Sequence, residues 1–187
     1  MVDLPWGDER SLQFVTNVGL ITSGGSAGYN IMAAEWTHHI SYSPGLIMVC
    51  IRPGKATHKN ISETKEFGVN LAAIDQSTLA HIAGTTSGFK TYKIIVFEEL
   101  GFSFYPARTI KSFMVRGAAL NAECKLVKTL NIGSHTIFIG EVLEASKNRK
   151  ESLVYSKGEF WKLSDRLASP SSEERKRIQT IIEKHKK

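Results

Sequence analysis

A cation, a flexible turn, a second cation and a hydroxyl group follow one another in the segment Arg52-Pro53-Gly54-Lys55-Ala56-Thr57. An apolar run at 46–51 precedes this segment, and a short helix is predicted over 57–66. The first N–H groups of a helix have no partner inside it, and the helix dipole adds roughly half a positive charge there. The segment therefore predicts a cradle for an anion such as a phosphate. Water is the alternative occupant, because most helix N-termini hold no phosphate.

The elements around this cradle are mostly predicted β-strands. A β-rich run at 14–22 ends in the glycine-rich segment 23–28, which indicates a hairpin turn. This segment lacks the lysine of a P-loop, so a turn is favoured over a phosphate-binding loop. Residues 30–43 carry β-branched and aromatic side chains without helical periodicity, and Ser43-Pro44-Gly45 indicates the next turn.

Helices are predicted as insertions between strands, over 77–83 and 91–100. Residues 119–126 alternate between apolar and polar side chains, which predicts a half-buried antiparallel strand with its polar face toward solvent. Residues 135–143 return as its partner. Repeated strands joined by short turns, with helices inserted between them, predict a mainly β protein built on an antiparallel barrel.

The chain ends in a predicted amphipathic helix. Ser171 and Glu174 have the spacing of a capping box. An apolar stripe follows one face of the helix at helical spacing. The residues of the stripe are Ile178, Ile181, Ile182 and His185. We expect this helix to pack against its own barrel or against a partner subunit.

The net charge of +6 is distributed unevenly along the chain. Residues 171–187 include six basic and three acidic side chains, so this tail contributes half of the net charge. A basic excess is compatible with binding to nucleic acid or to an anionic ligand. Nucleic-acid binding would require aromatic platforms among the cations, and the only aromatic-like residue of the tail is His185. A solvated helix face is therefore favoured, and nucleic acid is not an expected partner.

The 187 residues suit a single domain, with a barrel at about 11–163 and a helical tail at about 171–187. The longest apolar runs, of about six residues, are far below the roughly 20 needed to cross a bilayer. The N-terminus carries acidic residues and a proline where a signal peptide needs an apolar core. We therefore expect a cytoplasmic protein with no membrane partner. Cys50 and Cys124 are expected to be buried reduced thiols, and no metal site is predicted.

Three segments follow one family pattern. The first is Asn30-Ile31-Met32-Ala33-Ala34-Glu35-Trp36. The second begins at Ser43-Pro44-Gly45, continues through 52–58 and ends with the motif at 61–71. The third is Gly133-Ser134-His135-Thr136-Ile137-Phe138-Ile139-Gly140-Glu141-Val142. In this order and spacing, across roughly 14–163, they resemble the flavin reductase-like family of FMN-binding proteins.

The resemblance implies an antiparallel, Greek-key split β-barrel with a C-terminal helix, and it implies an FMN site. Thr57 and the helix N-terminus behind it would bind the FMN phosphate, with assistance from Arg52. Lys93 would supply a further cation near the flavin. The family usually has Asp-Lys-Phe where this chain has Thr91-Tyr92-Lys93, so Lys90 stays open as the alternative to Lys93.

The same resemblance implies how the flavin ring would be surrounded. The segment Asn30-Ile31-Met32-Ala33 would lie along the ring, and Trp36 would form a wall. Cys50 lies in a strand that passes the flavin, although an inert buried cysteine is the alternative. Phe160 would cover the site from the C-terminal region. Outside the family pattern, Trp36 and Phe160 would be ordinary core or interface aromatics.

His135 is the one residue with an implied catalytic role, because it would approach the flavin ring or the nicotinamide donor. On its own it would be a strand-end histidine without a function. The implied activity is an FMN-binding oxidoreductase, active as a homodimer. It would take electrons from NADH or NADPH to free flavin, a ferric complex or a partner protein. The alternatives are an FMN-binding electron carrier with poor NAD(P)H turnover and, less favoured, a basic nucleic-acid-binding β-barrel.

Overall fold

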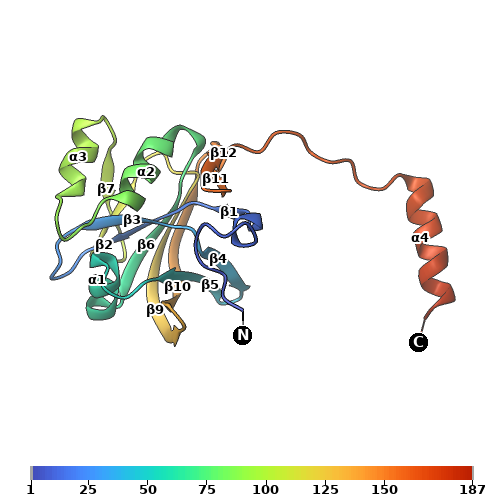
Figure 1. Cartoon of the computed structure of the whole chain (residues 1–187), viewed down its shortest axis with the longest axis horizontal. Coiled ribbons are helices and arrows are strands. Elements are labelled where there is room, and N and C mark those ends of the chain that lie inside the picture. The colour runs from blue at the N-terminus through green and yellow to red at the C-terminus, as the bar shows by residue number, and fades with distance from the viewer. Residues whose placement is uncertain (1, 187) are drawn as a thin grey trace.

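The computed structural model describes residues 2–186, and its centre is a seven-stranded antiparallel sheet (Figure 1). The strand order is β3-β2-β6-β9-β10-β5-β4. The bounds are β2 (Gly19–Ser23), β3 (Asn30–Ala34), β4 (Thr37–Tyr42), β5 (Gly45–Ile51), β6 (Glu66–Leu71), β9 (Leu120–Ile132) and β10 (His135–Lys147).

The first and last strands in this order, β3 and β4, follow each other in the chain and are joined by only Glu35 and Trp36. Such a short connection requires the two edges of the sheet to approach each other, so the sheet curls into a barrel. Helices are inserted between the strands. The prediction of a mainly β split barrel with inserted helices is therefore confirmed, as is the C-terminal helix.

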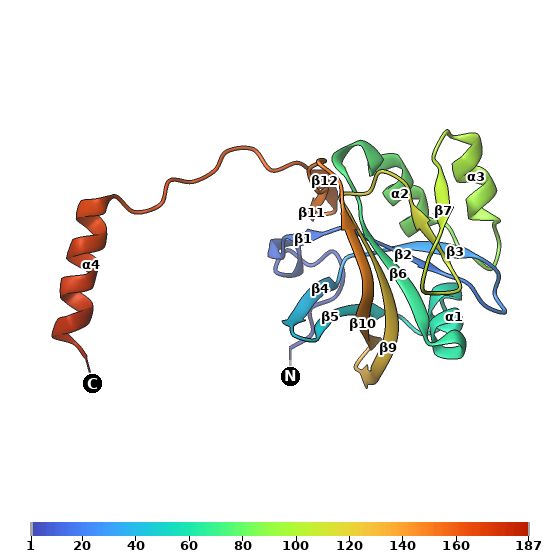
Figure 2. The same ribbon diagram turned by 180° about the vertical axis from the view of Figure 1, so that it is seen from behind.

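The inserted helices are α1 (Ala56–Thr64), between β5 and β6, and α2 (Ser77–Thr85) and α3 (Lys93–Glu99), between β6 and β7. Both α2 and α3 pack beside β3 (Figure 2). Two small sheets complete the barrel. One contains β1 (Thr16–Asn17), β11 (Val154–Ser156) and β12 (Glu159–Trp161), and the other contains β7 (Phe104–Pro106) and β8 (Phe113–Val115). Short 3-10 helices lie at Ser11–Gln13 and Ile74–Gln76.

The glycine-rich segment between β2 and β3 is a turn, as predicted, and α1 is fastened to it. The side-chain amide of Asn60 donates to the carbonyl of Gly28 at 2.8 Å, and Asn60 Oδ1 accepts from the N–H of Ala27 at 3.1 Å. A Cβ at Gly25 would lie 2.6 Å from Asn60 Oδ1, so glycine is needed for this close approach. These contacts hold the middle of α1 against the turn that leads into β3.

The core divides into two groups of buried apolar side chains. One group lies between the sheet and the helices α2 and α3, and it includes Leu20, Leu79 and Phe97. The other group fills the barrel and includes Phe67 and Phe138, both fully buried. Each buried phenylalanine of this kind stabilises the fold by roughly 1.5–3 kcal/mol relative to an exposed one.

The polar face of β9 is exposed at Lys125, as expected, but it is buried at Asn121 and Glu123, where the expectation is wrong. Asn121 and Glu123 are each only 4% exposed, because the segment 107–115 covers them. Glu123 accepts hydrogen bonds from the backbone N–H groups of Arg108 and Thr109, and Asn121 donates to the carbonyl of Val115 at 2.9 Å. The polar side chains of this strand form a buried hydrogen-bond network. The alternation of polar and apolar residues in the sequence looks the same for such a network as for a face exposed to solvent.

The C-terminal helix α4 (Ser172–Lys184) forms with the predicted capping box. Ser171 Oγ accepts from the N–H of Glu174 at 3.1 Å, and Glu174 Oε2 accepts from the N–H of Ser171 at 2.7 Å. Both views show α4 held away from the barrel at the end of an extended segment (Figures 1 and 2). All residues from 161 to 186 are exposed, so packing of this helix on its own barrel, one of the two expected arrangements, is wrong. No helix among residues 2–186 is long and apolar enough to cross a membrane.

Candidate functional site

Two adjoining cavities lie where the start of α1, strand β3 and the connection between α2 and α3 meet. The smaller has a volume of about 120 Å³ and the larger of about 690 Å³. Met32, Lys55 and Gly84 line both. The larger volume is in the range of roughly 300–1,000 Å³ that is typical of small-molecule sites.

The smaller cavity is built around a buried hydrogen bond from Asn30 Nδ2 to Thr57 Oγ1, at 2.7 Å. Because the Thr57 oxygen accepts this bond, the hydroxyl proton of Thr57 is available to another acceptor. Lys55, the N-cap residue of the nine-residue helix α1, makes no side-chain capping hydrogen bond. The first N–H groups of α1 are therefore also available, and this end of the site suits an anion.

The connection between α2 and α3 closes the other side of the smaller cavity with the sequence Gly84-Thr85-Thr86-Ser87-Gly88. Three consecutive hydroxyl side chains here add polar groups suited to an anion. A Cβ at Gly88 would collide with the side-chain amide of Asn30, so glycine allows the loop to approach β3. Sequence reasoning missed this loop, although hydroxyl residues between two glycines, joining two predicted helices, were a signal that could have identified it.

The smaller cavity also contains two cations, Lys55 and Lys93. Lys93 as a whole residue is only 3% exposed. Its ammonium group donates hydrogen bonds to the carbonyls of Ile31 at 2.9 Å and Ala83 at 3.0 Å. Burial, followed by repulsion from Lys55, lowers the pKa of Lys93 to about 8. Lys90 is exposed and lines neither cavity, so the structure brings Lys93, and not Lys90, to the site.

In the larger cavity, Trp36 and His135 lie against each other. Their ring centroids are 4.7 Å apart and their planes are tilted by 54°. His135 Nδ1 shares a hydrogen bond of 2.8 Å with Ser134 Oγ, which leaves Nε2 for a ligand. Burial and then the nearby Arg52 lower the pKa of His135, so the ring is neutral at neutral pH.

Arg52 and Cys50 line the larger cavity, at and just beyond the end of β5. Arg52 does not line the smaller cavity, where the cations are Lys55 and Lys93. Its charge therefore acts on the part of the site that contains His135. Burial raises the pKa of the Cys50 thiol, so this group is protonated at neutral pH.

Of four more residues expected to surround a flavin ring, two line the larger cavity and two line neither cavity. Met32 and Ala33 line the larger cavity, as residues beside a ring would. Ile31 and Phe160 line neither cavity. The side chain of Ile31 is fully buried in the core, and Phe160 packs against Tyr155, whose ring centroid is 5.6 Å away.

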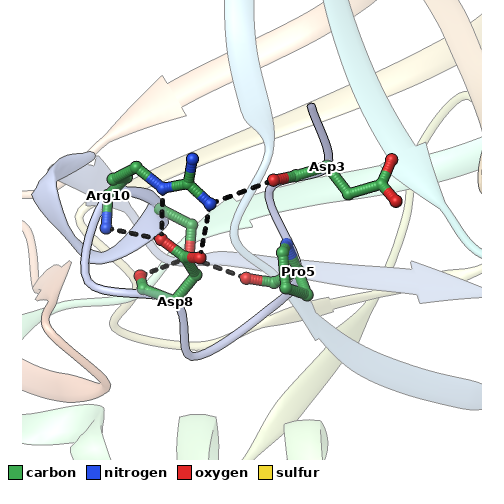
Figure 3. A network of polar contacts seen from close by, with 5 residues as sticks. Asp3, Pro5, Asp8 and Arg10 are labelled. Carbon is green, nitrogen blue, oxygen red and sulfur yellow. Dashed lines mark hydrogen bonds and ion pairs between the residues drawn. The ribbon is translucent and has the colours of Figure 1, made fainter. Parts of the chain in front are cut away.

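An N-terminal segment that sequence reasoning did not connect with the site forms an outer wall of the larger cavity. Its apolar side chains there include Leu4, Trp6 and Phe14. A polar network fixes the segment (Figure 3), in which Arg10 donates to the carboxylate of Asp8 at 2.7 and 2.8 Å. The sequence alone does not predict that these apolar residues line a site, because the surface that they face is formed by distant segments of the folded chain.

The remaining histidines do not form a second centre. His58 Nε2 shares a hydrogen bond of 2.9 Å with Thr136 Oγ1, and its ring packs edge-on against Phe138. Within residues 2–186 there is no group of three or more His, Cys, Asp or Glu side chains that could hold a metal ion.

A small basic cavity beside a larger, partly aromatic one lies on a curled antiparallel barrel, and this architecture is that of a split-barrel protein. A family model described as the flavin reductase like domain matches residues 11–164. The chain belongs to this family.

Three known proteins illustrate the relationship. An uncharacterized protein of Pyrococcus abyssi is 33% identical over 143 residues, covering 73% of this chain and 80% of the relative. An NADH-dependent FAD reductase of Streptomyces globisporus is 28% identical over 154 residues, or 79% of each chain. The structure of BorF, the flavin reductase component of a bacterial two-component tryptophan halogenase, is 32% identical with a TM-score of 0.72. That match covers 85% of this chain and all of BorF.

Proposed function

We propose that this protein is an FMN-binding oxidoreductase that takes electrons from NADH or NADPH and passes them through flavin to a second acceptor. The observation that carries the proposal is the pair of joined cavities, one basic and rich in hydroxyl groups, the other partly aromatic. The name of the Streptomyces relative, an NADH-dependent FAD reductase, supports a nicotinamide donor.

The smaller cavity would hold the phosphate of FMN. The hydroxyl of Thr57 and the first N–H groups of α1 supply neutral donors, and Lys55 and Lys93 supply charge. Asn30 would act mainly by orienting Thr57, because its amide already donates to Thr57 Oγ1. This donor set fits a phosphate monoester, which needs several hydrogen bonds and about two positive charges.

The larger cavity would hold the flavin ring and the groups that react with it. Met32 and Ala33 of β3 would lie along the ring, with Trp36, Cys50 and Arg52 around it. A bound flavin supplies the redox chemistry, accepting a hydride from the nicotinamide donor and releasing electrons to the acceptor. The chain's own work is to position the two rings and to exclude water, and this chemistry needs no nucleophile or general base from the chain.

His135 is the residue we propose to contact the reacting groups. It is neutral at neutral pH, and its Nε2 is not used by Ser134. It can therefore donate or accept a hydrogen bond at the ring or at the donor. Its contact with Trp36 restricts the orientation of the imidazole.

The acceptor could be free flavin, a ferric complex or a partner protein. The name of BorF describes the reductase component of a two-component halogenase, which supports a partner enzyme as one candidate. Two free thiols, Cys50 and Cys124, and an NAD(P)H donor suit a reducing compartment, so we propose a cytoplasmic location.

We also propose a homodimer in which α4 packs against the barrel of a second copy. Ile178, Ile181 and Ile182 are 45–54% exposed, and the connecting segment carries α4 clear of its own barrel. The test is sedimentation velocity of the full chain and of a chain ending at residue 162. A dimer that weakens on truncation is expected, and a monomeric full chain or an unchanged truncated dimer would contradict the arrangement.

The function is tested by titrating the purified protein with FMN and then measuring NADH and NADPH oxidation with several acceptors. FMN binding with turnover is expected. FMN binding without turnover would favour an electron carrier. A protein that takes up neither FMN nor FAD would contradict both flavin functions and leave the basic β-barrel as the candidate.

A further inference from the structure

The larger cavity contains one acidic side chain among its lining residues, Glu35, which follows directly after β3. The charged neighbours in the lining are all basic, namely Arg52, Lys55 and Lys157, and His135 adds an ionisable ring. The N-terminal segment contributes no charged side chain to the lining. Among the described residues that line this cavity, Glu35 is therefore the one side chain whose ionised form carries a negative charge at neutral pH and would attract a positively charged ligand.

The carboxyl group of Glu35 has no hydrogen-bond or ion-pair partner among residues 2–186, although the residue is half-buried. Burial raises the pKa of Glu35, and Glu35 in turn helps to raise the pKa of the nearby Tyr155 phenol. Partial burial makes the ionised form of this carboxyl group less favourable than it would be in water. A ligand that brings a positive charge or a donor group to this position would offset this effect.

The proposed reaction creates such a charge. In that reaction the C4–H bond of the dihydronicotinamide would break, and a hydride with both bonding electrons would form an N–H bond at flavin N5. The nicotinamide ring would be oxidised and gain a charge of plus one, while the flavin would be reduced and gain the balancing negative charge. The cations around the cavity disfavour the charged ring, and Glu35 opposes them.

We propose that Glu35 contacts the nicotinamide ring of the donor and binds its oxidised, positively charged form more tightly than its reduced form. This inference rests on the proposed function. It makes Glu35 a substrate-binding residue that stabilises the charge developing during hydride transfer, a role distinct from that of the neutral His135.

The test compares two dinucleotides that differ in ring charge and do not react. Protein loaded with oxidised FMN is titrated by calorimetry with NAD⁺ and with 1,4,5,6-tetrahydro-NADH, whose ring is neutral. The variant is Glu35→Gln, which keeps the shape and removes the charge. The matched control is Glu141→Gln, since Glu141 is also half-buried but lines neither cavity.

We expect Glu35→Gln to weaken NAD⁺ binding about tenfold and to leave tetrahydro-NADH binding within about twofold, while Glu141→Gln changes neither. Equal weakening of both ligands, or no change in either, would overturn the role of Glu35. If the wild-type protein binds FMN but neither dinucleotide, the inference fails and the flavin site stands. If it binds no flavin, the proposed function fails as well. The FMN absorbance spectrum and thermal unfolding of each variant verify that the fold is kept.

Discussion

The side-chain amide of Asn30, at the start of β3, donates a hydrogen bond of 2.7 Å to the hydroxyl oxygen of Thr57, in the first turn of α1. Both residues are buried, and both line the smaller cavity. The bond joins the strand proposed to lie along the flavin ring to the helix N-terminus proposed to hold its phosphate. Because Thr57 accepts this bond, its hydroxyl proton stays available to donate to a ligand oxygen.

Replacing Thr57 by valine keeps the volume and removes the hydroxyl. We expect FMN affinity to fall by roughly 10- to 100-fold, the loss of one hydrogen bond to a charged phosphate. The amide of Asn30 also loses its acceptor, so the free energy of unfolding should fall by about 1–3 kcal/mol. FMN fluorescence titration and urea unfolding measure the two effects.

Thr57→Ser is the matched control, because it retains the hydroxyl and should bind FMN nearly as well as the wild type. Riboflavin, which lacks the phosphate, should lose little affinity in Thr57→Val. Equal losses for FMN and riboflavin would show that Thr57 does not contact the phosphate.

FMN affinity should fall as the pH rises through about 8, the lowered pKa of Lys93, because the buried ammonium group loses its charge there. Binding of the FMN dianion favours the charged lysine and raises its pKa in the complex, so the affinity should keep falling from about pH 8 up to that higher pKa. The measurement is the FMN dissociation constant between neutral pH and the onset of unfolding. Riboflavin is the control ligand and should show a smaller pH dependence. Lys93→Met should bind FMN more weakly and lose the pH dependence, and a retained dependence would assign it to another group.

The same shift predicts how Lys93 affects the stability of the unliganded protein. The folded-state pKa of about 8 lies below the ordinary lysine pKa of 10.5, so between these pH values the unfolded chain binds more protons than the folded one. The contribution of Lys93 to the free energy of unfolding therefore rises with pH across this window. The wild type should therefore become more stable relative to Lys93→Met as the pH rises above about 8, because the buried amine is then neutral, and urea unfolding of both proteins at several pH values measures this change.

Replacing His135 by alanine should lower turnover more than flavin binding. Nε2 is the free nitrogen of the ring, and losing one hydrogen bond that strengthens in the transition state costs about tenfold in kcat. Steady-state NADH oxidation and FMN titration of the same variant separate the two quantities. An unchanged kcat would show that His135 only packs against Trp36.

Gly140 tests the barrel independently of the site. A Cβ there would lie 2.6 Å from the ring of Phe67 and 2.8 Å from Cβ of Cys124, so both neighbours must move. Gly140→Ala should lower the free energy of unfolding by about 1–3 kcal/mol. Gly45→Ala is the matched control, because the nearest atom to its Cβ would be Val142 Cβ at an ordinary 3.7 Å. Equal effects of the two substitutions would contradict the packing described for Gly140.

Much of this arrangement could be predicted from the sequence. The strands, the glycine turn and the helix after residue 55 follow from local patterns, and Asn30, Thr57 and Lys93 do line one cavity. Local sequence patterns could not predict which surfaces of the barrel are covered by segments that are distant in the sequence. The polar face of β9 became buried under 107–115, and the outer wall of the larger cavity came from the N-terminal segment.

The surroundings of Glu35 could not be predicted either, although Glu35 lies within one of the three segments that follow the family pattern. Its place between Ala34 and Trp36 was visible in the sequence, but its isolation from other acids and its lack of a partner depend on residues from β5, β10 and β11. For the C-terminal helix α4, the apolar stripe could be predicted from the sequence. Its position could not be predicted, because only the three-dimensional structure shows that the barrel of the same chain does not cover the stripe.

The central claim is most directly tested by the visible absorbance spectrum of the protein mixed with FMN and then with NADH in the absence of oxygen. The spectrum of FMN should shift on binding, the band should bleach when NADH is added, and it should return when an acceptor is supplied. A spectrum and a fluorescence of FMN that a large excess of protein leaves unchanged would show that this protein is not an FMN-binding oxidoreductase.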